Sequence, residues 1–510
     1  MEKNFNASDW EKYLPQPICE EFPQYAEFYK RAWTLAHEHV KYIDGMPQNP
    51  YMDEGFCDTQ VWIWDTCFMS LFCKFAQEVF PGVESFKNFY EVLYHGAVLP
   101  AVVPTEKEPF WTGAKQGEPF HIKVHIADNP PLFAWAEYEN ALYHGDKEYI
   151  KQLLYDKKSL QHHYDWLEGL HEKIKIANVH CGTHWIAEGL GYKWECGVSG
   201  MDNTPRGRMS EVAEKERPNN PDMYWIDAIC QQALSAKSIS RLFEMVDDSE
   251  NAKIWEDKFL AKKKIVNDFY WDTKDKFYYD IDCKDKHFYK VPTIASYWAL
   301  TAGIADNTQA QALLERVLDE GSFGGKVPLV SLSRSDGDFQ ESGKYWRGAL
   351  WLPTAYASLK GLAKYGFYEQ AQSIAHKIFK HMFETYKNYE PHTIWECYSP
   401  CEYAPSLKPN GQDRVRPDFC GWSALGPISI YLEFVLGFHT VNAFEGVVEW
   451  SKPNCFNGQF GVKNLRFGKV VTDIVANGKE CIVTASNAYI LKIDGVSYAI
   501  QKGENKIVLS

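Results

Sequence analysis

The sequence lacks concentrated positive charge and long apolar runs. Its 54 Lys and Arg residues are outnumbered by 68 Asp and Glu residues, which gives a formal net charge of −14. Short basic clusters such as YDKKSL and LAKKKI are typical of solvated helix faces. A surface of this charge repels phosphate backbones, so we expect no nucleic-acid partner. No uncharged run reaches the roughly 18–20 apolar residues that span a bilayer, so we expect no membrane partner either.

The sequence also lacks paired cysteines and an export signal. Its 13 cysteines form no CxxC pair, and the nearest spacing is that of Cys397 and Cys401. Without a Cys/His cluster at ligand spacing, we expect no metal and no cofactor. The opening MEKNFNASDWEKYLP has no apolar signal core, and dispersed thiols favour a cytoplasmic location. A signal peptide removed before export would leave the same sequence, so that alternative stays open.

Helical periodicity dominates the first 438 residues. Apolar residues recur three and four positions apart in about a dozen segments, many of them in adjacent pairs with Gly or Pro at the breaks. Paired helices in this number predict an α/α toroid with a funnel of loops at one end. An irregular helical domain or an α-solenoid is the alternative, but no fixed repeat of about 30–45 residues is present.

The pattern changes near residue 440. Short β-branched segments separated by Gly, Asn and Lys follow, and ANGKE carries an Asn-Gly hairpin signal. We therefore predict two domains, a helical domain over residues 1–438 and a small antiparallel, sandwich-like β module over residues 439–510. The module has no nucleophile or ligand cluster, so packing against the helical domain is its expected role.

Several polar, aromatic-rich loops lie between the predicted helices. WIWDTCF places Trp64 beside Asp65, which is either a helix N-cap or a hydrogen-bonding partner for sugar hydroxyls. Asn129 precedes the Pro-Pro start of another helix. Three further aromatic and basic candidates, which form a packed cation–π group or a ligand clamp, are Tyr345, Trp346 and Arg347.

Two carboxylates fit a shared chemistry. Asp202 lies in the glycine-studded loop GVSGMDNTPRGR, and Glu396 follows Trp395 in WECYSP. A carboxylate against a large ring loses hydration, which raises its pKa. Glycoside hydrolysis needs two carboxyl groups across the scissile bond, although any large protein offers such pairs.

Five motifs, taken in order, resemble glycoside hydrolase family 63, whose clan includes the trehalases of family 37. They are WIWDTCF, DNPPLFAWA, SGMDNTPR, YWRGALWLPTAYASLKGLAKYG and WECYSP, and they span roughly residues 50 to 437. The compact layout is similar to the short bacterial members. The resemblance implies an (α/α)6 barrel and an inverting mechanism that acts on a small glycoside or oligosaccharide of the α-glucoside or α-mannoside type.

The resemblance also implies roles for particular residues. Asp202 matches the general acid and Glu396 the general base. The residues expected to contact the substrate are Trp64, Asp65, Asn129, Tyr345, Trp346, Arg347, Trp395 and Arg206. Members often carry Glu where this sequence has Val198, which puts one substrate hydrogen bond in doubt. The PGGRF-type and QWDxPxGWxP signatures of trehalases are absent, so trehalose is disfavoured.

Two alternatives remain open from the sequence. A sugar-binding protein without turnover would bind glycosides and release no product. Another α/α-toroid enzyme, such as a phosphorylase, lyase or epimerase, would need phosphate or a Tyr or His base. The candidate histidines are His121, His125, His184 and His392. The sequence leaves the oligomeric state open.

Overall fold

The computed structural model describes residues 3–43, 46–55, 60–91, 102–104, 129–169, 185–194, 196–207 and 220–509. The helices of the described residues are α1 (Tyr25–Glu38), α2 (Ile63–Cys73), α3 (Lys87–Tyr90), α5 (Phe133–His144), α6 (Lys147–Lys151), α7 (Ser159–Glu168), α9 (Ile226–Met245), α10 (Ser249–Phe269), α11 (Trp298–Ala302), α12 (Asn307–Leu318), α13 (Leu352–Lys364), α14 (Tyr368–Asn388) and the π-helix η8 (Gly426–Val435). None of them is long and apolar enough to cross a bilayer.

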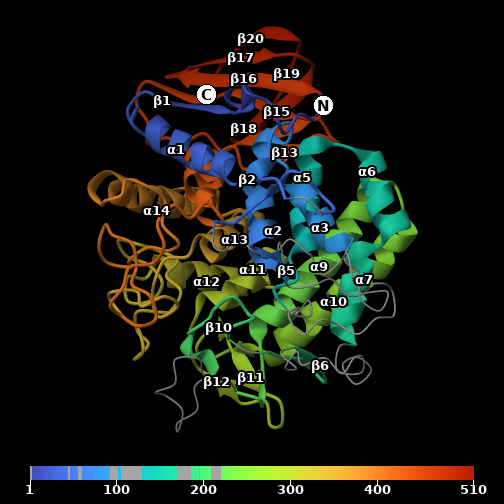
Figure 1. Ribbon diagram of the computed structural model, residues 1–510, viewed down its shortest axis with the longest axis vertical. Helices are drawn as coiled ribbons and strands as arrows, with labels where there is room; N and C mark the ends of the chain where they lie inside the picture. Colours follow the sequence, from blue (N-terminus) through green and yellow to red (C-terminus); the bar gives the residue numbers. More distant parts are fainter. Residues whose placement is uncertain are drawn as a thin grey trace.

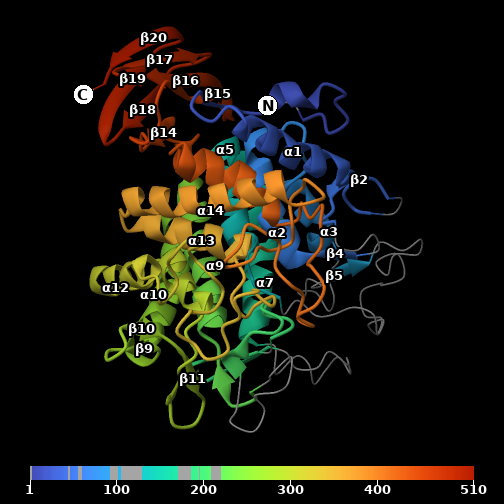
Figure 2. The same cartoon turned by 90° about the vertical axis from the view of Figure 1, so that its left-hand side faces the viewer.

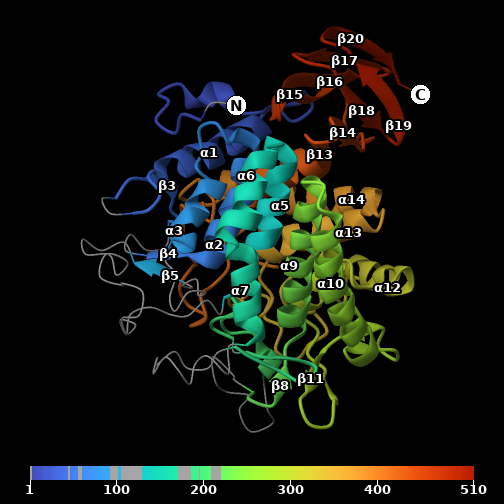
Figure 3. The same ribbon diagram turned by 90° about the vertical axis from the view of Figure 1, so that its right-hand side faces the viewer.

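Six of these segments form a closed inner ring. In the described part of the chain, α2, α5, α9, α11, α13 and η8 each pack against the next, and η8 returns to α2. Every residue of α2, α11 and η8 is buried, as expected of helices that are apolar on all sides. The helices α1, α7, α10 and α14 cover this ring from outside (Figures 1 and 3). The arrangement fits an α/α toroid.

Local signals account for several helix boundaries. The Asp306 side chain accepts from the Gln309 backbone in a capping box at the start of α12. The sequence over residues 147–171 has helical periodicity throughout, but the structure divides it into α6, a π-helix (Gln152–Lys157) and α7, with Lys158 at a left-handed φ of 55° between the last two. Helical periodicity also starts at Tyr345, but the segment before α13 is irregular and contains Tyr345 at φ 68°.

The β module contains two sheets, which accords with the sandwich-like prediction. One has the order β1-β15-β16-β17-β20 and the other β13-β14-β18-β19. Their strands are β1 (Gln16–Cys19), β13 (Thr440–Asn442), β14 (Val447–Trp450), β15 (Gln459–Phe467), β16 (Val470–Asn477), β17 (Glu480–Ala485), β18 (Tyr489–Ile493), β19 (Val496–Ile500) and β20 (Gly503–Val508). The Asn-Gly hairpin is confirmed, because Asn477 pairs with Glu480 across Gly478.

Two predictions about this module need correction. It is not wholly antiparallel, because β14 and β18 pair in parallel. The domain boundary at residue 438 also misses a strand from the N-terminus, since β1 pairs with β15 from Gln16↔Lys463 to Cys19↔Phe460. The main-chain hydrogen bonds of that added strand tie the start of the chain to its end.

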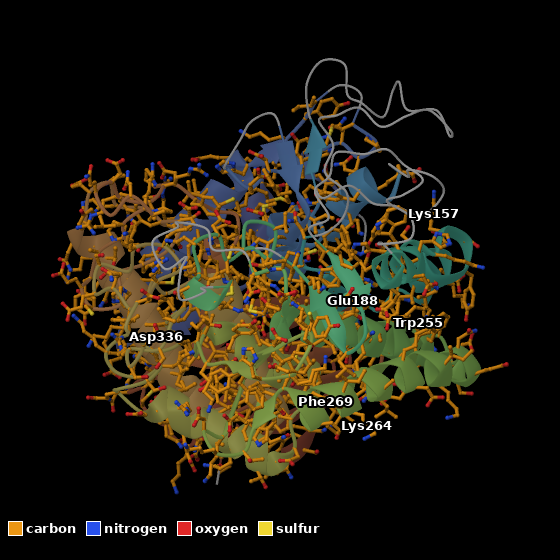
Figure 4. All side chains as sticks on the ribbon, turned by 90° about the horizontal axis from the view of Figure 1, so that it is seen from below. Lys157, Glu188, Trp255, Lys264, Phe269 and Asp336 are labelled. Carbon is orange, nitrogen blue, oxygen red and sulfur yellow. The ribbon has the colours of Figure 1, made fainter. Side chains whose placement is uncertain are left out.

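The two ends of the toroid differ. The β module lies at the end where the ring helices α2 and α5 finish, and it contacts the 3-10 turn η2 (Lys74–Ala76) (Figure 2). Several short strands, among them β6, β8, β11 and β12, lie at the opposite end (Figures 1 and 3), which Figure 4 views from below with Glu188 and Asp336 labelled. The short strands are β2 (Val40–Lys41), β3 (Tyr51–Met52), β4 (Gln60–Trp62), β5 (Val102–Pro104), β6 (Ile186–Glu188), β7 (Gly191–Lys193), β8 (Met223–Tyr224), β9 (Trp271–Asp272), β10 (Phe277–Tyr278), β11 (Asp280–Asp282) and β12 (Phe288–Tyr289).

Candidate active site

The candidate residues converge at the N-terminal ends of the ring helices. Trp64 and Asp65 lie in the first turn of α2, whereas Asn129, Asp202 and Glu396 lie in loops that precede α5, α9 and η8. The charges of Glu396 and Asp202 both act on Asp65, and both act on Tyr345. Because such effects weaken with distance, these four groups lie near one another.

Glu396 is held tightly in a buried setting. Its side chain is 3% exposed, the Tyr345 hydroxyl donates to its Oε1 at 2.7 Å, and the Arg416 backbone N–H donates to its Oε2 at 3.3 Å. Its own carbonyl accepts from Trp422 Nε1 and Ser423 Oγ. Burial raises the pKa of Glu396, while the Tyr345 hydrogen bond and the Arg416 charge oppose that rise.

Asp65 is not the N-cap of α2. Trp62 occupies the cap position, and Asp65 is the third helical residue, where an acidic side chain suits the helix dipole. Burial raises the pKa of Asp65 well above its usual value, and the charges of Glu396, Asp53 and Asp202 add to the rise. A raised pKa favours the protonated form, which can donate a hydrogen bond to an oxygen atom.

The loop that carries Asp202 is folded onto Trp64. Gly200 adopts a φ of 81°, and a Cβ there would lie 3.2 Å from the Trp64 ring, so glycine allows this close approach. Ser199 stabilises the turn through its Oγ, which donates to the Cys196 carbonyl. Asn129 Nδ2 donates to the Val198 carbonyl at 3.1 Å, which ties the loop to the start of α5. In the structure Asn129 therefore supports the loop that carries Asp202.

Asn203 links the loop of the proposed acid to the residue that holds Glu396. Its Nδ2 donates to the Lys344 carbonyl at 3.0 Å, and its Oδ1 accepts from the Trp346 N–H at 2.8 Å. Tyr345 stands between these two partners with a φ of 68°, a strained conformation for a large side chain. Trp351 Nε1 also donates to the Tyr345 carbonyl at 3.1 Å. These bonds hold the backbone on either side of Tyr345, and they therefore keep its hydroxyl within hydrogen-bond distance of Glu396.

The structure places three other predicted contacts in the walls around the site. Trp346 is 1% exposed and stacks on Trp351 with ring centroids 4.1 Å apart, so its ring packs in the wall, and its contact with substrate stays a prediction. Arg347 lies 3.4 Å from Asp338 in an ion pair, and no cation–π contact is found for it among the described residues. Trp395 is buried against Tyr389.

Arg206 requires a correction. Its side chain is fully buried, and its guanidinium forms hydrogen bonds of 2.6–2.9 Å with the carboxylates of Asp227 and Asp280. Its remaining donor reaches Met201 Sδ at 3.6 Å, and Trp225 covers it in a cation–π contact. With every donor engaged, Arg206 has none for a sugar, and it instead braces the loop behind Asp202.

Two residues of this region were not predicted from the sequence. Asn203 stands directly after Asp202, and an amide beside the proposed acid was the available signal. Glu54 is fully buried near Asp65, and burial with the charges of Asp53 and Asp65 raises its pKa well above its usual value. An acid pair in the aromatic-flanked YMDEGF was the signal there.

Some predictions lie elsewhere. The candidate residues His121, His125 and His184 fall outside the described residues, and His392 is an exposed residue near Glu390. One group of possible metal ligands is found in the described chain, namely Asp282, Asp285 and His287. Asp282 Oδ1 already accepts two backbone N–H groups of its own hairpin, so turn geometry explains this group.

The ring of helices, with its aromatic and carboxylate-lined end, defines a glycoside hydrolase of the α/α-toroid type. The family model described as "Mannosylglycerate hydrolase MGH1-like glycoside hydrolase domain" matches residues 59–406. The chain therefore belongs to this family, within glycoside hydrolase family 63, and the resemblance read from the motifs is confirmed.

The chain is also similar to several individual proteins. An uncharacterized protein of Borreliella burgdorferi is 25% identical over 68% of this chain and 67% of its own length. The mannosyl-oligosaccharide glucosidase of Saccharomyces cerevisiae is 24% identical over 54% of this chain, which spans 34% of that protein. The GH63 mannosylglycerate hydrolase of Thermus thermophilus, solved with glucose, shares the fold at a TM-score of 0.57 and 15% identity, over 79% of this chain and 99% of that one.

Proposed function

We propose that this glycosidase hydrolyses an α-glycosidic bond of a small glycoside with inversion of configuration. The observation that carries the proposal is the buried Glu396, held by Tyr345 near Asp202 and Asp65. Two carboxyl groups of this kind, one as acid and one as base, are what an inverting hydrolysis needs.

In the proposed mechanism, Asp202 donates a proton to the glycosidic oxygen as its bond to the anomeric carbon breaks. Glu396 accepts a proton from a water molecule, whose oxygen attacks that carbon from the opposite face. After turnover Asp202 is ionised and Glu396 is protonated, and proton exchange with solvent restores both. Asp65, which burial favours in its protonated form, is proposed to donate to a hydroxyl of the bound sugar.

The charges of Arg416 and Lys408 both act on Glu396 and oppose the rise in its pKa, which favours the ionised form that a base requires. The family name and the Thermus relative make mannosylglycerate the first compound to assay, followed by other α-mannosides and α-glucosides.

Leaving-group dependence separates the two proposed roles. Asp202→Asn should lose activity on an alkyl glycoside by about 10²–10⁴-fold, because that leaving group needs a proton. It should lose far less on a glycosyl fluoride, which needs none. Glu396→Gln should lose activity on both substrates alike. Asp413→Asn, at an exposed turn carboxylate, is the matched control. Wild-type rates in both site variants would contradict the proposal.

A further inference from the structure

A second cavity opens on the toroid, away from the candidate active site. It has a volume of about 1200 Å³ and lies among α5, α9, α10, α13 and β13. Most of its lining from the ring comes from the later turns of α5, α9 and α13, whereas the candidate catalytic groups lie at the N-terminal ends of the ring helices. The two spaces therefore occupy opposite ends of the same ring.

The inner wall of this cavity is a neutral ion cluster. Lys74 Nζ lies 2.9 Å from Glu433 and 3.4 Å from Glu139. Lys360 Nζ lies 2.9 Å from Glu139 and 3.2 Å from Glu433, and the Tyr356 hydroxyl donates to Glu433 Oε1. Two ammonium groups thus face two carboxylates, and this cluster has no charge left to neutralise.

Most other charges in the lining are also matched one to one. On α9, Lys237 pairs with Glu256 and Arg241 pairs with Glu244, both at 2.6 Å. Lys147 pairs with Asp247 at the rim. The Asp306 carboxylate is engaged in the capping box of α12. Glu445, on the loop after β13, is the remaining carboxylate of the lining.

Two lysines of the cavity have no carboxylate partner among the described residues. Lys263 of α10 donates to the Gly303 carbonyl at 2.9 Å, and Lys364 of α13 donates to the Thr301 carbonyl. Both ammonium groups therefore meet at the turn that ends α11. An ammonium group has three donors, and a single backbone carbonyl uses one of them.

The surroundings of Lys364 disfavour its charge. Burial lowers the pKa of Lys364 to about 8 against the attraction of Glu139, and the charges of Lys360, Lys237 and Arg241 contribute to the lowering. Aromatic faces complete the cavity and could cover an organic group, namely Trp135, Tyr138 and Tyr368.

We propose that this cavity binds a small dianion of the phosphate-ester class, with Lys263 and Lys364 as its charged partners. Two ammonium groups bonded to backbone carbonyls of the same turn, both with donors to spare, match a phosphate group, which carries nearly two negative charges at neutral pH. The ester's organic part would lie against the aromatic residues of the wall. The alternative is that both lysines only cap the C-terminal end of α11 by donating to its last carbonyls, and this alternative predicts no anion binding.

Calorimetric titration with inorganic phosphate and with a hexose phosphate tests this proposal, at constant ionic strength set by chloride. The wild type should bind both anions, and the hexose phosphate more tightly because of the aromatic wall. Lys364→Met and Lys263→Met should each weaken binding, with a Kd raised by about tenfold or more. Lys253→Met, an exposed residue of α10 paired with Asp257, is the matched control and should bind as the wild type does. Asp202→Asn should also bind unchanged, which separates this cavity from the proposed active site.

No binding by the wild type, or an unchanged Kd in both cavity variants, would overturn the proposal. If the variants fold poorly, wild-type crystals soaked in tungstate give an independent readout. An anomalous peak between the amino groups of Lys263 and Lys364 would support the site, and its absence would reject it.

Discussion

Replacing Tyr345 with Phe removes one hydrogen bond and leaves the ring in place. The Tyr345 hydroxyl donates to Glu396 Oε1 at 2.7 Å and lowers the pKa of that carboxyl against the effect of burial. The bond favours the ionised form of Glu396, which is the form a general base requires. Its loss therefore raises the pKa of Glu396 and leaves less ionised base at acidic pH.

The magnitude follows from the strength of such bonds. A hydrogen bond to a charged group contributes about 1.5–3 kcal/mol, and one pH unit corresponds to about 1.4 kcal/mol. The acidic limb of kcat/KM against pH should therefore move up by about one to two units in Tyr345→Phe. The rate on that limb should fall roughly 10- to 100-fold, and the loss should shrink at higher pH.

The assay is hydrolysis of one glycoside over a range of pH values, with wild type and variant side by side. Tyr297→Phe is the matched control, because it removes a buried hydrogen bond to the Leu313 carbonyl far from Glu396. An acidic limb that stays in place in Tyr345→Phe, or that moves equally in the control, would refute the reasoning.

The other predictions concern the supports of the site. Asn203→Ala removes the bonds that bracket Tyr345, so kcat should fall about tenfold with little change in KM, and the acidic limb should move in the same direction as in Tyr345→Phe; an unchanged pH profile would count against the linkage. Arg206→Met leaves the buried carboxylates of Asp227 and Asp280 without their cation, so urea unfolding should show a loss of about 3–5 kcal/mol. Arg241 forms an exposed ion pair with Glu244, so Arg241→Met should lower the free energy of unfolding by at most about 1 kcal/mol. Equal losses in the two variants would contradict the structural role of the buried Arg206.

The spacing of apolar residues predicted most helices and strands, because the buried face of each element determines where apolar residues recur. The strands from β14 to β20 fall where β-branched runs and turn residues indicated, and the Asn477-Gly478 hairpin is present. The pairing of β1 with the C-terminal sheet could not be predicted, since it joins residues more than 440 positions apart through backbone hydrogen bonds. Main-chain pairing over such a distance leaves no local sequence pattern.

The ordered motifs singled out Asp202, Glu396 and Tyr345, and the roles given to them stay predictions. In the structure Tyr345 bonds to Glu396, and the charges of Glu396 and Asp202 both act on Tyr345. Arg206 was misassigned because the local sequence around an arginine beside a glycine-rich loop is the same whether the arginine binds substrate or two distant aspartates. Asn203 was missed because its value depends on Lys344 and Trp346, 141 and 143 residues away.

The anomeric configuration of the first-formed product tests the central claim most directly. Proton NMR of an α-mannoside or α-glucoside during early hydrolysis should show the β-anomer first, followed by slow mutarotation. A product that appears first as the α-anomer would contradict the roles proposed for Asp202 and Glu396.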